Sequence, residues 1–360
     1  MSTSQARPVK TESRPPDECA EEVAEGILRI MLPVDLPGLG HVNCYVLEDD
    51  RGLTLIDPGI ADGVTHRVLT ERLAAVGLDV RRVHTAVVTH SHLDHFGGIA
   101  RLHAIDTIVP VETVGHRSFG EGWRTAYDSI VQSEDSGSLE PRTDDEVSAI
   151  TGHLVRDTPW GTSTKPFPVD LLLTWSAGID IFDVFRPPVI SRPLDDADVL
   201  NMGGRAWTAL HTPGHADDHL CFWSADLGVL FGGDHLLPTI TPHISGISTY
   251  DDPLQEFFDS LERVGELEGA TIVLPAHGDP YTDLSGRASD IAEHHHRRLD
   301  RIREIGQEIG PATVEDYMQM LFRERSWGSM AMSETYAHLE WLRLHDGASS
   351  EEKFDLTYKI

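Results

Sequence analysis

The feature that most constrains this chain is the segment TAVVTHSHLDHFGG, which spans residues 85–98. It has the pattern of a short apolar strand that runs into a loop with four ligand-type side chains, His90, His92, Asp94 and His95. Two imidazoles at positions i and i+2 point to the same side of an extended backbone. Imidazole and carboxylate groups are ligands for zinc, iron and manganese. We therefore expect this segment to be a buried strand that ends at a metal site, rather than a His-rich surface loop.

Length and charge narrow the range of folds and partners. The chain has 360 residues, enough for a large core and an appendage. Its net charge of −30 disfavours nucleic acids as partners, because phosphate binding needs clustered Lys and Arg. Three scattered cysteines fit a reducing cytosol better than a disulfide framework. No apolar segment approaches the length of a membrane span, so we expect a soluble, cytoplasmic protein with no membrane partner.

The composition predicts a tail, a main domain and an appendage. Residues 1–20 are polar and contain prolines, which indicates a disordered tail. Strand, helix and turn patterns alternate over residues 21–295, whereas residues 296–360 favour helices and a short strand, as in a winged-helix domain. An insertion at about residues 116–193 is rich in aromatic residues and proline. We expect it to form either a lid over the site or a structural excursion that packs on the core.

Local patterns predict individual elements along the chain. Residues 107–111 favour a short strand, and residues 313–322 favour a helix that opens with a cap-like Thr-x-x-Asp sequence. Residues 293–307 favour a helix rich in His and Arg. Consecutive residues of a helix face different directions, so we expect the histidines at 294–296 to lie on a solvated face and not to bind metal.

Further ligand-type residues, His215, Asp234 and His277, lie in glycine-containing turns after predicted strands, where glycine permits a tight bend. The full set of predicted metal ligands is His90, His92, Asp94, His95, His215, Asp234 and His277. One zinc ion can be bound by His90, His92 and His215, which leave a position open. A second ion can be bound by Asp94, His95 and His277, and Asp234 can bridge both ions. Metals about 3.5–4 Å apart share a hydroxide that is nucleophilic at neutral pH.

Two more residues are candidates for supporting roles. Asp57 ends a predicted strand in the sequence Asp-Pro-Gly, which is a turn signal and equally a place where a carboxylate orients a metal ligand from behind. His243 follows Asp234 in the sequence LPTITPHISG. A plain loop histidine is the favoured interpretation of His243, with substrate binding as the alternative.

These motifs resemble those of the metallo-β-lactamase superfamily over residues 25–295. All seven ligand positions match the metal motifs of that family, and Asp57 matches its first aspartate motif. The resemblance implies an α/β fold, an αββα sandwich with a dinuclear site at the sheet edge, here with an inserted cap segment and a C-terminal, mostly helical appendage. The sequence TPGHADDH and the C-terminal helices are similar to a lactamase-β-like branch with a C-terminal winged helix, which includes a mitochondrial endoribonuclease and bacterial hydrolases.

The resemblance and the ligand set predict an enzyme with two Zn²⁺ ions per chain, with iron or manganese as alternatives. In the leading hypothesis, a bridging hydroxide attacks the carbonyl carbon of a small-molecule ester, thioester, lactone or amide. Asp94 would orient this nucleophile and receive its proton. The alternatives are a metal-dependent endoribonuclease and a mononuclear iron enzyme like the persulfide dioxygenases, which keep the same three-ligand first site.

Charge weighs against the endoribonuclease. A nucleic-acid-reading winged helix should carry a basic second long helix, yet residues 333–345 hold Arg343 against Glu334 and Glu340. The arginines of residues 297–303 are interleaved with acidic residues at helical spacing, which partly neutralises them. We therefore expect the appendage to be structural, forming a homodimer contact or part of the pocket wall.

Overall fold

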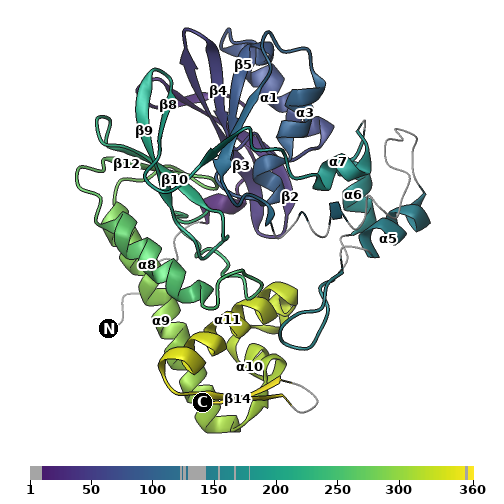
Figure 1. Cartoon of the computed structure of the whole chain (residues 1–360), viewed down its shortest axis with the longest axis vertical. Coiled ribbons are helices and arrows are strands. Elements are labelled where there is room, and N and C mark those ends of the chain that lie inside the picture. The colour runs from purple at the N-terminus through teal and green to yellow at the C-terminus, as the bar shows by residue number, and fades with distance from the viewer. Residues whose placement is uncertain are drawn as a thin grey trace, which may run out of the picture.

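The computed structural model of the chain describes residues 10–121, 124, 127–128, 143–152, 155–165, 168–177, 179–352 and 356–360. Within these residues, two β-sheets pack face to face, and helices cover the outer face of each sheet (Figure 1). The four layers are those of an αββα sandwich, as the resemblance implies.

Both sheets mix antiparallel and parallel strands. The first sheet contains, in spatial order, β1 (Glu21–Ala24), β2 (Ile27–Leu36), β3 (Leu39–Asp49), β4 (Gly52–Ile56), β5 (Val83–Val87), β6 (Glu112–His116) and β7 (Arg192–Leu194). The second contains β12 (Ile272–Pro275), β11 (Val229–Gly233), β10 (Leu220–Ser224), β9 (Arg205–His211) and β8 (Val199–Met202). Strands β4 to β7 pair in parallel, as do β11 and β12, so their carboxyl ends gather at one edge of each sheet.

The alternation of side chains along β3 shows how the sandwich forms. Cys44 and Val46 face the helices outside the first sheet, whereas Tyr45 and Leu47 face the second sheet. Tyr45 meets Phe231 of β11 there, with ring centroids 5.1 Å apart. Successive side chains of a strand point to opposite faces, so an uninterrupted apolar run is buried on both sides.

Helices complete the outer layers. The helices of the main body are α1 (Gly63–Ala75), α2 (Leu93–Phe96), α3 (Gly98–Ala104), α5 (Asp144–Gly152), α6 (Val169–Trp175), α7 (Ile181–Phe185), α8 (Pro253–Gly265) and α9 (Leu284–Ile309), with 3-10 turns at Thr11–Ser13 and Val80–Arg82. The first sheet is covered by α1, α3 and α5 to α7, whose apolar residues share one buried core with that sheet. The second sheet is covered by α8 and α9 in the same manner.

The predicted insertion connects the neighbouring parallel strands β6 and β7. In its described part, Leu172, Trp175 and Phe182 are buried in the core outside the first sheet. Residues 155–165 reach the C-terminal helices instead, where Trp160 lies 5.4 Å from Tyr336 between ring centroids. The helices of the insertion therefore pack on the core. The lid remains a prediction, and residues 129–142 lie outside the described residues.

The C-terminal segment adds α10 (Val314–Leu321), a 3-10 turn at Glu324–Ser326, α11 (Ser329–His345) and a sheet of β13 (Ala312–Thr313), β15 (Leu356–Lys359) and β14 (Ser349–Glu352) in that spatial order. The predicted cap is confirmed, because Thr313 and Asp316 form a reciprocal capping box at the start of α10. Helix α9 runs unbroken through the expected boundary at residues 295–296. The winged-helix domain and the division of the chain there stay predictions.

Three local predictions are wrong. The strand expected at residues 107–111 lies at β6 instead, because Pro110 has no N–H to donate and Ile108 is 73% exposed. Disorder does not extend over residues 10–20, since buried Glu12 accepts hydrogen bonds from the N–H groups of Thr239 and Ile240. Residues 1–9 lie outside the described residues. Finally, His295 is fully buried and not solvated, because it lies on the face of α9 that packs against α8 and α11.

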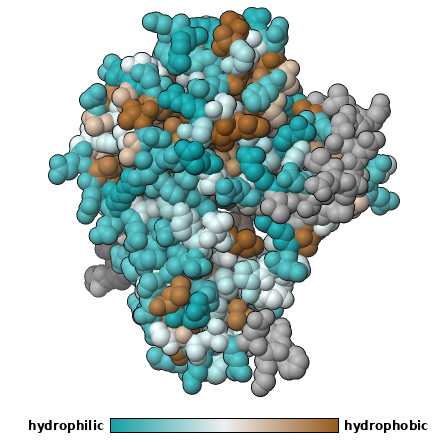
Figure 2. Space-filling view, viewed as in Figure 1, coloured by the Kyte–Doolittle hydropathy of each residue, from teal (hydrophilic) through white to brown (hydrophobic). Residues whose placement is uncertain are grey.

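Hydrophilic side chains predominate on the face shown in Figure 2, and apolar side chains are scattered among them. Among the described helices, none is both long and apolar enough to cross a membrane.

Candidate metal centre

The seven predicted ligands gather at one edge of the sandwich, where strands of both sheets end. His90 follows β5, His92 occupies the N-cap position of the short helix α2, and α2 carries Asp94 and His95. The other three residues come from the second sheet, in the loop after β9, at the end of β11 and at the end of β12: His215, Asp234 and His277. All of them except His92 are buried, so the set forms a polar centre enclosed by the two sheets.

Four ligand atoms form the first group. His92 Nδ1 lies 2.9 Å from His90 Nε2 and 3.1 Å from His215 Nε2. Asp234 Oδ2 lies 3.4 Å from His215 Nε2 and 3.9 Å from His90 Nε2. Three imidazole nitrogens and one carboxylate oxygen that face one another in this way form a donor set that suits a zinc ion.

The second group shares Asp234 with the first. His277 Nε2 lies 3.4 Å from Asp94 Oδ2 and 3.3 Å from Asp234 Oδ1. His95 Nε2 lies 3.7 Å from Asp94 Oδ2 and 3.6 Å from Asp234 Oδ2. Asp234 thus faces both groups, as expected for a bridging residue.

Several of these buried atoms lack a hydrogen-bond partner among the described residues, namely His95 Nε2, His277 Nε2 and Asp234 Oδ1. A buried polar atom without a partner costs free energy, about 1–3 kcal/mol per group. Divalent cations would satisfy all three atoms at once, so the donor set fits the metal that the residues imply.

Hydrogen bonds on the far side of the imidazoles fix their orientation. The Nδ1–H group of His95 donates to Asp57 Oδ2 over 2.9 Å. His215 donates in the same manner to the carbonyl oxygen of His243, and His277 to that of His41, each over 2.6 Å. Each bond places a proton on Nδ1, so Nε2 is the nitrogen turned inward toward the other ligands, which is the usual arrangement behind a metal-binding histidine.

Asp57 has the supporting place that its motif suggested. Besides His95, its carboxylate accepts hydrogen bonds from the N–H and the hydroxyl group of Thr89, both over 2.8 Å. Its backbone has φ = +53°, a left-handed conformation that costs a non-glycine residue free energy. Strain of this kind is typical of functional sites, and here it aims the carboxylate at the ligand loop.

Charge within the site moves the pKa values in two directions. Burial and the neighbouring imidazoles lower the pKa of His92 to about 3, so its ring is neutral and free to bind metal. Burial alone would lower the pKa values of His95 and His277 as well, but Asp94 and Asp234 outweigh it and raise both. The carboxylates therefore make the second group attractive to cations, whether protons or metal ions.

Sequence reasoning missed His219, although it lies within the TPGHADDH motif. Its Nδ1–H group faces Thr212 Oγ1 at 2.8 Å, and its Nε2 accepts a hydrogen bond from the N–H of Asp234 over 3.1 Å. Gly233, with φ = +52°, has no room for a side chain, because a Cβ atom would lie 2.4 Å from His219 Nε2. His219 and Gly233 together hold the bridging Asp234 in place.

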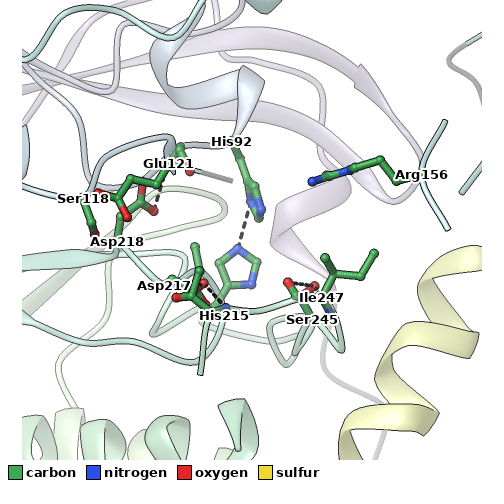
Figure 3. Close-up of a pocket in the computed structure, with 12 residues that line it drawn as sticks. His92, Ser118, Glu121, Arg156, His215, Asp217, Asp218, Ser245 and Ile247 are labelled. Carbon is green, nitrogen blue, oxygen red and sulfur yellow. Dashed lines mark hydrogen bonds between the residues drawn. The ribbon is translucent and has the colours of Figure 1, made fainter. Parts of the chain in front are cut away.

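A pocket of about 210 Å³ opens beside the first group (Figure 3). The residues that line it include His92, His215, Ser118, Glu121, Arg156, Asp217, Asp218, Ser245 and Ile247. Arg156 comes from the insertion and extends toward His92. Asp218 is buried and accepts hydrogen bonds from the N–H groups of Gly120 and Ser91, which ties the start of the insertion to the ligand loop.

His243 lies in the loop after β11, as the favoured interpretation of its sequence position expects, and substrate binding by its ring stays a prediction. Its carbonyl group orients His215, and Nδ1 of its ring lies 3.9 Å from Glu334 Oε2 on α11. Ser245 and Ile247 of the same loop line the pocket. The loop thus contacts both the ligand His215 and the pocket.

Comparisons with known proteins agree with the geometry. A family model described as "Metallo-beta-lactamase superfamily" matches residues 37–277. A Bacillus subtilis protein named "Probable metallo-hydrolase YqjP" is 26% identical over 336 residues, 91% of this chain and 95% of that protein. The crystal structure of a metallo-beta-lactamase family protein from Thermus thermophilus has a TM-score of 0.73 at 27% identity, and the match covers 94% of this chain and 100% of that one. An "Atrochrysone carboxyl ACP thioesterase" from Cryptosporiopsis is 32% identical over 152 residues, 42% of this chain and 44% of that protein.

Proposed function

The chain belongs to the metallo-β-lactamase superfamily of metallo-hydrolases, and on that premise we propose that it hydrolyses a small-molecule thioester or ester with two zinc ions. The observation that carries this proposal is the pair of neighbouring ligand groups beside an open pocket, with Asp234 of the first group also facing His95 and His277 of the second. Two zinc ions would supply an activated water and polarise the substrate carbonyl group.

The chain's own residues have separable roles in this reaction. Burial would raise the pKa of Asp94, but His95 and His277 lower it to about 2, so its carboxylate is ionised at neutral pH and can orient the attacking water. The pocket beside His92 and His215 would hold the acyl group and the leaving group. Arg156 is the arginine that extends toward His92 in this pocket, where its guanidinium group could contact an anionic part of the substrate.

Among carbonyl compounds, a thioester is favoured by the partial match to an acyl-carrier-protein thioesterase. RNA is disfavoured because four of the five arginines of α9 are engaged in ion pairs, and the fifth, Arg287, donates to the carbonyl groups of Leu237 and Ile240. The pairs are Arg297–Glu293, Arg298–Glu334, Arg301–Glu304 and Arg303–Asp346. A phosphate backbone would have to displace these carboxylates, so the helix offers no strip of available positive charge.

The test uses the full chain loaded with two equivalents of Zn²⁺ per chain. Acyl thioesters, esters, lactones and a structured RNA are compared. Thiol release from the thioesters is measured with a thiol-reactive dye, acid release from the esters and lactones by titration, and RNA cleavage by gel electrophoresis. We expect thioester or ester hydrolysis that falls at least about 100-fold in Asp94→Asn, in the range of a lost general acid–base contribution. Metal-dependent RNA cleavage without carbonyl hydrolysis would contradict the proposal, as would oxygen consumption by an iron-loaded enzyme that is inactive with zinc.

A further inference from the structure

The loop that orients the ligand His215 is enclosed by the C-terminal helix α11. This loop joins β11 to α8, and its His243 carbonyl oxygen accepts the hydrogen bond from His215 Nδ1–H over 2.6 Å. A carbonyl group can orient an imidazole only if its own peptide group is held in a fixed position. The contacts that hold this peptide therefore bear on the first group of metal ligands.

Helix α11 packs closely against the loop just after His243. The Ser333 hydroxyl oxygen accepts a hydrogen bond from the N–H of Gly246 over 2.8 Å. A Cβ atom on Gly246 would lie 2.6 Å from the Ser333 carbonyl oxygen and 2.7 Å from the ring of Tyr336, so only glycine allows this approach. Ile244, between the two loop residues, is fully buried in the core that α11 shares with α8 and α9.

Glu334 adds a fixed charge at the same place. One carboxylate oxygen lies 3.9 Å from Nδ1 of the His243 ring, and the other contacts Arg298 of α9. Burial raises the pKa of Glu334, but Arg298 outweighs it and holds this pKa well below its usual range. The carboxylate is thus ionised and paired, with only 11% of its side chain exposed.

A buried network holds the turn of α11 that carries Glu334. His338 Nδ1–H donates to the Glu334 carbonyl oxygen over 2.6 Å, and His338 Nε2 lies 3.1 Å from His295 Nδ1 on α9. These three side chains lie close enough to bind a metal ion, but Arg298 already neutralises the carboxylate. The cluster is therefore a structural network that fixes α11 against α9.

We infer that α11 positions the metal ligand His215, with Ser333 and Glu334 as the positioning residues that hold the loop carrying the His243 carbonyl group. This inference rests on the proposed metal site. It gives the C-terminal segment a specific role, because α11, about 120 residues along the chain from His215, would set the geometry of the first ligand group. The histidines of the second group are oriented by other parts of the chain, His277 by the carbonyl group of His41 and His95 by Asp57.

The test compares Glu334→Gln with Glu340→Gln in the full chain. Glu340 lies on the same helix and is similarly buried, with 13% of its side chain exposed, but it contacts Arg343 and Tyr358 and not the loop. Zn²⁺ affinity is measured by competition with a chelator. Glu334→Gln is expected to weaken one of the two zinc sites about 10- to 100-fold, as is typical for residues behind a metal ligand, and to spare the other. Glu340→Gln should leave both unchanged.

A second readout does not need metal. In ¹⁵N-labelled metal-free protein, the His215 Nδ1–H proton should give a hydrogen-bonded imidazole resonance, which should shift in Glu334→Gln and in Ser333→Ala. If the protein binds no zinc but this resonance shifts, the proposed function fails and the positioning role stands. An unshifted resonance, or equal zinc affinities in Glu334→Gln and Glu340→Gln, would overturn the inference.

Discussion

Replacing Asp57 by Asn is expected to weaken metal binding at the group of Asp94, His95 and His277 and to spare the other group. The Asp57 carboxylate accepts hydrogen bonds from the Thr89 N–H, from the Thr89 hydroxyl and from His95 Nδ1–H. An asparagine amide has the same shape, but one of its two ends is a donor. Whichever way the amide turns, its NH2 group faces an N–H donor, either the backbone N–H of Thr89 or the Nδ1–H of His95.

The magnitude follows from the bond that is lost. A hydrogen bond to a charged group contributes about 1.5–3 kcal/mol. At about 1.4 kcal/mol per factor of ten, this corresponds to about 10- to 100-fold in an equilibrium constant. The same range is typical when the partner behind a metal-binding histidine is removed. We therefore expect a loss of about 10- to 100-fold in the affinity of one metal ion.

The assay is chelator competition with Zn²⁺, which resolves a stronger and a weaker site. Asp62→Asn is the matched control, because buried Asp62 accepts hydrogen bonds from the N–H and hydroxyl groups of Thr65, both over 2.7 Å, and caps α1 away from the site. The reasoning is refuted if Asp57→Asn retains both affinities. It is also refuted if Asp62→Asn loses as much affinity, because the effect would then be a general loss of stability.

Three further predictions follow from the site. His95 and His277 have raised pKa values, so metal must displace protons there, and Zn²⁺ affinity should rise from pH 6 to pH 8 with proton release in a calorimeter. Arg156→Gln should raise KM about tenfold for thioesters with an anionic group and leave neutral thioesters unaffected, as steady-state kinetics would show. Gly233→Ala should lower the free energy of unfolding by at least about 1–3 kcal/mol in urea denaturation, because φ is +52° and the new Cβ would clash with His219.

Each of these has a contrary outcome. A Zn²⁺ affinity independent of pH would show that neither histidine is protonated in the metal-free protein. Equal changes in KM for anionic and neutral thioesters would remove Arg156 from substrate recognition. A Gly233→Ala variant as stable as the unaltered protein would show that the loop around Asp234 can relax, and would weaken the role given to His219.

The sequence by itself predicted the ligand set and many of the strands that carry it, whereas the αββα sandwich followed from the resemblance to a known family. Apolar runs such as the one in β3 indicate strands that are buried on both faces, and the ligands follow the ends of those strands within short motifs. Such motifs are local, because the spacing in HxHxDH already decides which side chains can meet. The resemblance to a known family then predicted how the distant motifs join.

Tertiary structure alone decided how the ligands are held. The His243 carbonyl group that orients His215 belongs to the backbone, so no residue type in the sequence marks it. The closeness of Glu334 to His243 and the burial of His295 depend on how α11 packs against α9 and the loop. Contacts between segments far apart in the chain are set by packing, and a helical histidine run has the same local pattern whether its face meets solvent or another helix.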